Sequence, residues 1–221
     1  MLSNLFSVNL YYTIYFNLRY FSWKDAMKLP VLIFGKVSVN ALKGNVKING
    51  AIKTGMIRFG EQIVGIYDKK LRTVFNIHGT FQFDGRAILA RGSSISIGKG
   101  ASLTTGDNFK ITAKSAIIAS GGKSVTFGAD CLLSWDVLIM NTDFHKMIDL
   151  DKDEVKPFSN DIHIGHKVWI GCGVKVLKGA QIPSGSIVAA GSIVTGKLTD
   201  ESCIYAGAPA RMIRPNTSWK E

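Results

Sequence analysis

Four histidines are the side chains of this sequence best suited to proton transfer near neutral pH. An imidazole can take a proton from an attacking hydroxyl and return it to a leaving group, so one well-placed histidine can serve as a general base. His145 is the candidate, because it ends the segment SWDVLIMNTDFH just before a charged stretch that is typical of a loop. His163 lies between two isoleucines on a predicted strand, His166 at a corner and His78 in an irregular region. We expect structural roles for these three.

The cysteines could form disulfides or bind a metal, but their number and spacing favour neither. Cys131, Cys172 and Cys203 are odd in number and lack metal-ligand spacing, so free thiols in a reducing compartment are expected. His163 and His166 are three residues apart around a corner and would diverge. We therefore expect no metal site, and we expect the protein to be cytoplasmic.

A six-residue repeat indicates the elements that position His145. Six aliphatic residues occur at intervals of six without a miss, at Ile164, Ile170, Val176, Ile182, Val188 and Val194. Neither a helix nor an ordinary strand buries every sixth residue, whereas a short strand plus a turn does. Three such units close a triangular coil of about eighteen residues, and stacked coils form a solenoid. Pro183 and the many glycines of this block exclude an amphipathic helix.

A looser form of the same signal covers the middle of the chain. Triplets with apolar first and third residues, each followed by Gly, Asn or Asp, recur from Val37 to Ile162. The six-residue phase is lost between His145 and Ile164. The charged sequence in this gap predicts a loop that leaves the solenoid, and long loops on a regular scaffold are often functional. We therefore predict a solenoid over 37–205 with an active-site loop at 146–161, followed by a C-terminal tail over 206–221.

Residues 1–36 lack the repeat and are rich in aromatic side chains. The run from Leu5 to Phe21 is too polar to span a bilayer and is not preceded by the basic region of a signal peptide. Our first interpretation is a cap over the open end of the solenoid. The second is a peripheral contact with the inner face of the membrane, in which Arg19, Lys24 and Lys28 meet anionic headgroups.

The formal net charge of +11 favours phosphate-bearing or acidic partners. The lysines are scattered and accompany no recognised nucleic-acid motif, so we do not expect nucleic acid to be the partner.

The sequence IGHKVWIGCGVKVLKGAQIPSGSIVAAGSIVTG, followed by YAGAPARMIR, resembles the hexapeptide-repeat acyltransferases. It is most similar to the branch of galactoside, maltose and xenobiotic acetyltransferases, and within it to the O-acetyltransferases of capsule and surface-polysaccharide pathways. The strong match covers about residues 125–214. The resemblance implies an all-β, left-handed parallel β-helix, a homotrimer with active sites between adjacent subunits, and acetyl-coenzyme A as acyl donor.

The resemblance also implies roles for individual residues. His145 matches the general base of direct acyl transfer. The positions that match coenzyme A contacts are Cys172, Ala190, Thr195, Gly196, Arg211 and Arg214, while Trp169 either packs in the wall or borders the cofactor channel. Small residues at 172 and 190 would let backbone amides approach the pantetheine arm, and the two arginines offer forks for phosphate. Gly196 departs from the lysine that relatives often carry there.

Acceptor contacts are expected on the segment before His145. Trp135 offers a stacking face, while Asp136, Asn141 and Asp143 offer hydrogen bonds to a sugar. Asp143 is alternatively placed to orient the imidazole. The asparagine that galactoside-type relatives present to the acceptor has no clear counterpart around Lys114 to Ile118.

These observations predict a coenzyme A-dependent O-acyltransferase, biased to acetyl, that modifies a hydroxyl of a glycan or glycan precursor. Two alternatives stay open at this point. The solenoid could be a noncatalytic scaffold without affinity for acetyl-coenzyme A, or the enzyme could acetylate an amino sugar, a serine or an antibiotic.

Overall fold

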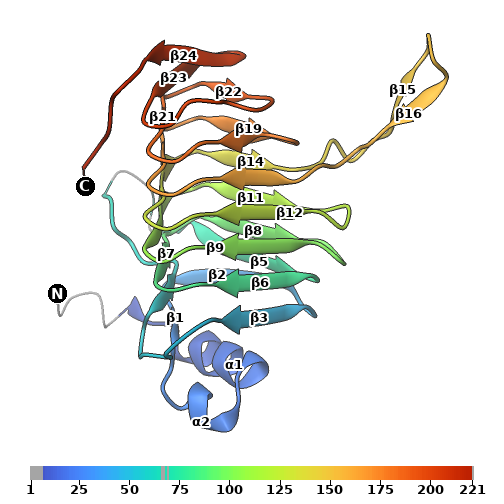
Figure 1. The fold of residues 1–221 in the computed structure, drawn as a ribbon. Helices are drawn as coiled ribbons and strands as arrows, with labels where there is room; N and C mark the ends of the chain where they lie inside the picture. The colour runs from blue at the N-terminus through green and yellow to red at the C-terminus, as the bar shows by residue number, and fades with distance from the viewer. Residues whose placement is uncertain (1–6, 66–67, 69, 221) are drawn as a thin grey trace.

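Three parallel sheets wind around one core to form a β-helix in a computed structural model that describes residues 7–65, 68 and 70–220 (Figure 1). We call the sheets I, II and III, and the chain visits them in that order in each coil. Sheet I contains β1 (Val31–Ile33), β4 (Ile57–Phe59), β7 (Ala87–Leu89), β10 (Phe109–Ala113), β13 (Leu132–Trp135), β18 (Trp169–Ile170), β21 (Ile187–Val188), β23 (Ile204–Gly207) and β24 (Ala210–Arg214).

The other two sheets complete the triangular section. Sheet II contains β2 (Lys36–Leu42), β5 (Arg72–Ile77), β8 (Ser94–Ile97), β11 (Ala116–Ala119), β14 (Leu138–Met140), β19 (Lys175–Leu177) and β22 (Ile193–Val194). Sheet III contains β3 (Asn45–Ile48), β6 (Thr80–Phe83), β9 (Ser102–Thr105), β12 (Ser124–Phe127), β17 (Ile162–Ile164) and β20 (Gln181–Ile182).

The six-residue repeat is seen in the burial of the late coils. All six aliphatic residues from Ile164 to Val194 are buried, and Trp169 aligns with Ile187, one eighteen-residue coil later. The coil length differs in the middle of the chain, where Lys110 aligns with Leu132 after twenty-two residues. Most strands in the middle coils have four or five residues, whereas those in the late coils have two or three, so the middle coils are longer. In both regions the apolar side chains of the repeat point into the core.

The core changes in character along the solenoid axis. Near the N-terminal end it is filled by rings, with Phe59 and Phe75 centroids 4.8 Å apart and those of Phe81 and Phe83 4.1 Å apart. In the late coils it is filled by isoleucine and valine. The first coils therefore have a wider interior, which needs a lid at its open end.

Two helices close this end (Figure 1). They are α1 (Leu10–Tyr20) and α2 (Trp23–Ala26). The Asn17 side chain donates to the Val31 carbonyl at 2.7 Å and accepts from the Val31 N–H at 3.1 Å, and the Thr13 hydroxyl accepts from the Ile33 N–H at 3.0 Å. These side chains satisfy the open edge of β1, which would otherwise expose unpaired backbone groups. Part of the aromatic run, up to residue 6, lies outside the described residues.

The expected domain boundaries differ from the coil boundaries at both ends. The first coil begins with β1, inside the segment 1–36, because Val31 already pairs with Ile57. At the other end β24 lies inside the segment 206–221 and pairs antiparallel with β23. The segment 146–161 forms a hairpin of β15 (Met147–Asp149) and β16 (Glu154–Lys156) that projects as an arm (Figure 1). Over the described residues, neither helix is long and apolar enough to cross a bilayer.

Candidate active site

His145 lies at the base of the projecting hairpin. It follows β14 by five residues, at the edge where the chain passes from sheet II to sheet III, and its side chain is exposed. Within the described part of the chain, neither ring nitrogen of His145 has a hydrogen-bond partner. The imidazole is therefore open to an incoming hydroxyl, as a general base requires.

Asn141 holds the backbone that leads to His145. It is fully buried, and its side-chain oxygen accepts from the Ser120 N–H at 2.8 Å while its NH2 group lies 3.4 Å from the Ser120 carbonyl. The Thr142 hydroxyl then accepts from the Phe144 N–H at 3.0 Å. The Asn141 amide is used inside the chain, so the geometry favours a positioning role over the acceptor contact expected from the sequence.

A lysine that the sequence did not point to joins the two ends of the hairpin. Lys178, which follows β19 in the neighbouring coil, forms an ion pair with Asp143 and donates to the Pro157 carbonyl at 2.9 Å. The Asp143 carboxylate thus meets Lys178 within the chain. No sequence signal connects these residues, because they are thirty-five positions apart and come together only through the stacking of coils.

A second group of expected site residues lies on a different edge, between sheets I and II. The Gly173 N–H donates to the Trp135 carbonyl at 3.0 Å, and the Gly191 N–H donates to the Cys172 carbonyl at 2.8 Å, so residues 135, 172 and 190 stack coil above coil. The stacking is tight, since a Cβ added to Gly171 would lie 2.7 Å from the Ala190 nitrogen. Small residues along this edge leave backbone accessible to a ligand.

The acid on this edge is already paired. The Asp136 carboxylate and the Lys114 ammonium are 3.1 Å apart, with both side chains about half exposed. The indole of Trp135, the residue before Asp136, is partly exposed. An indole face next to a charged pair can contact a sugar ring and its hydroxyls.

Trp169 lies on the outer face of sheet I. Its indole N–H donates to the Ser134 hydroxyl at 3.1 Å, and its ring centroid is 6.2 Å from that of Trp219. The C-terminal tail carries Trp219 back along sheet I, where its indole N–H donates to the Lys167 carbonyl at 2.9 Å. Trp169 is therefore held in place by the wall and by the tail.

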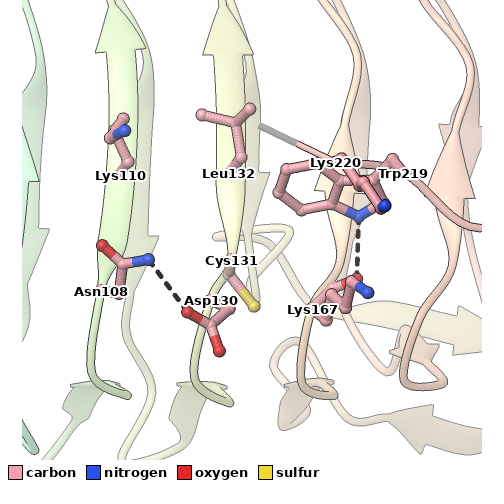
Figure 2. A pocket seen from close by; sticks show the side chains of 8 residues that line it. All are labelled: Asn108, Lys110, Asp130, Cys131, Leu132, Lys167, Trp219 and Lys220. Atoms are coloured by element: carbon pink, nitrogen blue, oxygen red, sulfur yellow. Dashed lines mark hydrogen bonds between the residues drawn. The ribbon is translucent and has the colours of Figure 1, made fainter.

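The tail borders a pocket of about 400 Å³ on sheet I (Figure 2), and His145 is not among the residues that line it. In the wall of this pocket the Asn108 side chain donates to the Asp130 carboxylate at 2.9 Å, and Cys131 is the next residue of the lining. Burial raises the pKa of the Cys131 thiol to about 11, so this group is protonated at neutral pH and is not a nucleophile. The described residues lining the pocket are Asn108, Lys110, Asp130, Cys131, Leu132, Lys167, Trp219 and Lys220.

The remaining expected contacts lie toward the C-terminal end of the solenoid. Thr195 and Gly196 follow β22 and belong to the same edge as His145. Arg211 and Arg214 are exposed on β24. Most of the expected residues are thus divided between two edges of the prism, while Trp169 lies on the face of sheet I and the two arginines lie on β24, so one chain does not bring all of them together.

The other histidines have structural partners or lie apart. The Nδ1 atom of His163 is 2.8 Å from the Thr126 hydroxyl, and Nδ1 of His166 accepts from the Ala129 N–H at 3.0 Å. His78 follows β5 at a corner. Among residues 7–65, 68 and 70–220, no three metal-binding side chains gather into one site.

Comparison with known proteins gives relatives but no matching family model. The chain is 34% identical over 143 residues to the polysialic acid O-acetyltransferase of Escherichia coli O1:K1 / APEC, which are 65% of this chain and 43% of that protein. It is 38% identical over 116 residues to the polysialic acid O-acetyltransferase of Neisseria meningitidis, covering 52% and 51%. The match thus spans about half the length of these two enzymes. An uncharacterized 24.8 kDa protein of the Klebsiella pneumoniae cps region is 29% identical over 91% of this chain and 86% of its own length.

Solved structures show the same fold. The polySia specific acetyltransferase NeuO superposes with a TM-score of 0.55 at 24% identity, over 84% of this chain and 89% of that one. The polysialic acid O-acetyltransferase OatWY superposes with a TM-score of 0.57 at 20% identity, over 86% and 77%. The all-β, left-handed parallel β-helix expected from the sequence is confirmed, as is the resemblance to O-acetyltransferases of surface polysaccharides.

Proposed function

We propose that this chain, which resembles polysaccharide O-acetyltransferases in sequence and in fold, transfers an acetyl group from coenzyme A to a hydroxyl of a surface polysaccharide or its precursor. The observation that carries the proposal is the placement of His145. Its exposed imidazole stands at the base of the arm on a backbone fixed by Asn141 and by the pair of Lys178 with Asp143. A rigid support of this kind holds a base in a productive position.

The proposed reaction is direct transfer. The imidazole of His145 takes the proton of the acceptor hydroxyl while the hydroxyl oxygen attacks the thioester carbonyl of acetyl-coenzyme A. The tetrahedral intermediate collapses, the carbon–sulfur bond breaks, and the coenzyme A thiolate takes the proton from the imidazolium. A backbone N–H near the thioester would stabilise the oxyanion.

The edge between sheets I and II suits the pantetheine arm of the donor. Ala190 and Gly191 are exposed and small, and nothing lies within 4 Å of a Cβ added to Gly191, so a chain-like ligand can lie against this backbone. We place the phosphates near Arg211 and Arg214, whose guanidinium groups can bind them in a bidentate manner. Thr195 and Gly196 would contact the donor from the other edge.

The division of the residues between two edges supports a homotrimer. These edges flank sheet II, so cyclic symmetry can bring the His145 edge of one subunit against the Ala190 edge of the next. The hairpin supports the same arrangement, because its apolar side chains reach beyond the body of their own chain. Leu150 is 90% exposed, and Ile148 and Val155 are both 59% exposed. We propose that a neighbouring subunit covers this arm.

The acceptor class follows from the relatives and from the character of the site edge. Two relatives are named as enzymes that act on polysialic acid, a polymer. We propose that Trp135 stacks on a sugar ring of the acceptor and that Asp136 and Lys114 contact its polar groups. Cys131, Cys172 and Cys203 are free thiols, and we propose that the protein works in the reducing cytoplasm.

The test is an acetyl-transfer assay on purified chain. Acetyl-coenzyme A and a panel of capsular oligosaccharides are supplied, and products are identified by the mass of an added acetyl group. We expect His145→Ala to lower kcat by at least about 100-fold with unchanged acetyl-coenzyme A affinity, while His163→Ala stays near wild type. Near wild-type turnover of His145→Ala would overturn the assigned base. Absence of acetyl-coenzyme A binding in calorimetry would instead favour a noncatalytic scaffold, and an acetylated amine would move the acceptor to amino sugars.

A further inference from the structure

The helical cap has an apolar face that the proposed acyl transfer does not use. On α1, Leu10, Tyr11, Ile14, Tyr15 and Leu18 point away from the solenoid, since they follow one face of the helix and are all exposed. Thr13, Phe16 and Asn17 occupy the opposite, buried face. The helix thus has a buried side, which closes the end of the core, and an exposed apolar side, which has no such role.

The second helix extends this face. Trp23 is 71% exposed and Met27 is 63% exposed, and both border a hollow of about 270 Å³ that also touches Ile14 and Leu18. We call these seven side chains the cap face: Leu10, Tyr11, Ile14, Tyr15, Leu18, Trp23 and Met27. A contiguous group of large apolar side chains on a surface marks an interaction site.

The distribution of charge around the cap face indicates what kind of partner it binds. Residues 1–56, the cap and the first coil, contain seven basic residues and one acidic residue, whereas the rest of the chain contains twenty and fifteen, so a quarter of the chain carries more than half of the net charge of +11. Arg19, Lys24, Lys28, Lys43, Lys47 and Lys53 are exposed there. Asp25, the single acidic residue, is paired with Lys28 at 2.8 Å. An aromatic and aliphatic face with basic residues around it fits an anionic lipid surface.

The same charges argue against a second copy of the chain on this face. Two copies joined cap to cap would bring their excess of positive charge together without acidic partners. The composition points the same way, because tyrosine and tryptophan favour the headgroup region, where the ring is apolar and the polar atom stays hydrated.

We propose that the cap face binds the surface of an anionic membrane. Leu18 and Trp23 enter the boundary between headgroups and acyl chains, and the lysines of the cap and first coil contact the headgroups. The hairpin, β23 and β24 lie toward the opposite end of the solenoid (Figure 1), so the candidate active site stays away from the lipid. This proposal is independent of the acyl transfer.

The test is cosedimentation of the purified full chain with vesicles. Wild-type chain is expected to bind vesicles of phosphatidylcholine mixed with phosphatidylglycerol, and to bind pure phosphatidylcholine at least about tenfold more weakly. Leu18→Ser combined with Trp23→Ser should reduce binding to the anionic vesicles at least about tenfold, because both side chains leave the bilayer boundary. Lys24→Glu combined with Lys53→Glu should reduce binding to anionic vesicles only.

The matched control changes two exposed apolar residues at the other end of the solenoid. Met212→Ser combined with Ile213→Ser should bind vesicles like wild type. Circular dichroism checks that each variant is folded. The proposal is overturned if the wild-type chain does not bind anionic vesicles. It is also overturned if the control variant loses as much binding as the Leu18 and Trp23 variant. A drop in assembly mass by light scattering in the Leu18 and Trp23 variant, without loss of vesicle binding, would overturn it in favour of a contact between copies.

Discussion

Lys178 forms an ion pair with Asp143 at one end of the projecting hairpin while it donates a hydrogen bond to Pro157 at the other end. One ammonium group therefore joins the departing and returning strands at the body of the solenoid. The Lys178 side chain is only 22% exposed, so water screens this pair less than an open surface pair. His145 lies two residues beyond Asp143, so the pair restricts the backbone that carries the proposed base.

We expect Lys178→Met to lower kcat about tenfold and to leave the KM for acetyl-coenzyme A nearly unchanged. The physical reason is that the hairpin base loses its tether, so His145 is less often in a productive position. Steady-state kinetics measure both constants. Lys99→Met, at an exposed lysine on another coil, is the control and should behave as wild type.

The double variant separates coupling from general damage. Asp143→Asn with Lys178→Met should cost no more activity than the worse single variant, because each single change already breaks the pair. Costs that multiply would contradict the idea that the two residues act as one unit.

The two-edge arrangement predicts complementation between inactive chains. Ala190→Trp places bulk on the edge proposed for the pantetheine arm, and His145→Ala removes the base from the other edge. Unfolding and refolding an equal mixture should restore about a quarter of wild-type activity, because one pairing of subunits in four contains two intact edges. Each variant refolded alone is the control. Mixtures as inactive as the separate chains would show that each site lies within one subunit.

The cap predicts a local effect on stability. Phe16 is 1% exposed, and its ring centroid lies 5.8 Å from that of Phe59 and 5.9 Å from that of Phe75. Phe16→Ala should destabilise the first coils by about 3 to 5 kcal/mol, the usual cost of a cavity left by a phenylalanine. Hydrogen exchange should accelerate in β1 and β2 and stay slow in β18, since each coil depends mainly on its neighbours. Leu18→Ala, on the exposed face of α1, should change little.

The stability of the fold should depend on pH through Asp161, which lies where the chain returns from the hairpin to the solenoid. The Ser124 N–H donates to its carboxylate at 2.7 Å, and this bond, aided by the Ser124 hydroxyl at 2.8 Å and by Lys123, holds the pKa of Asp161 below its usual value. Because the folded pKa is lower than the unfolded pKa, the stabilisation is present above the unfolded pKa and is lost as the pH falls through the folded one.

We therefore expect Asp161→Asn to lower the free energy of unfolding by about 1 kcal/mol at neutral pH, a value reduced for solvent screening. The difference between wild type and variant should shrink as the pH falls below about 4. Chemical denaturation at neutral and acidic pH measures it. A difference of the same size at both pH values would contradict the assignment.

Periodic features of the fold were predictable because they depend on local sequence. Ile164 and its five partners in the repeat are buried as the spacing indicated, and the loss of the phase after His145 located the hairpin. The coil length in the middle of the chain was less predictable. Strands there are longer by about two residues, and an apolar alternation allows a strand to lengthen without changing which side chains point inward.

Side-chain partnerships between coils were outside the reach of the sequence. Asn17 pairs with the β1 edge, and Lys178 meets Asp143, over separations that no periodicity encodes. The sequence predicts an acceptor contact at Asn141, whereas the structure buries this side chain and gives it a hydrogen-bond partner in Ser120.

The sequence by itself determined the solenoid, its interruption after His145 and the resemblance to acetyltransferases, because a repeat of six and short motifs are properties of neighbouring residues. Only the tertiary structure decided that most of the expected site residues are divided between two separate edges, that one lysine ties the hairpin base, and that α1 turns an apolar face outward. The first two facts depend on how many residues each coil contains, because a change of a few residues per coil moves a side chain to another face of the prism. The orientation of α1 depends on the hydrogen bonds of Asn17 and Thr13 to the edge of β1.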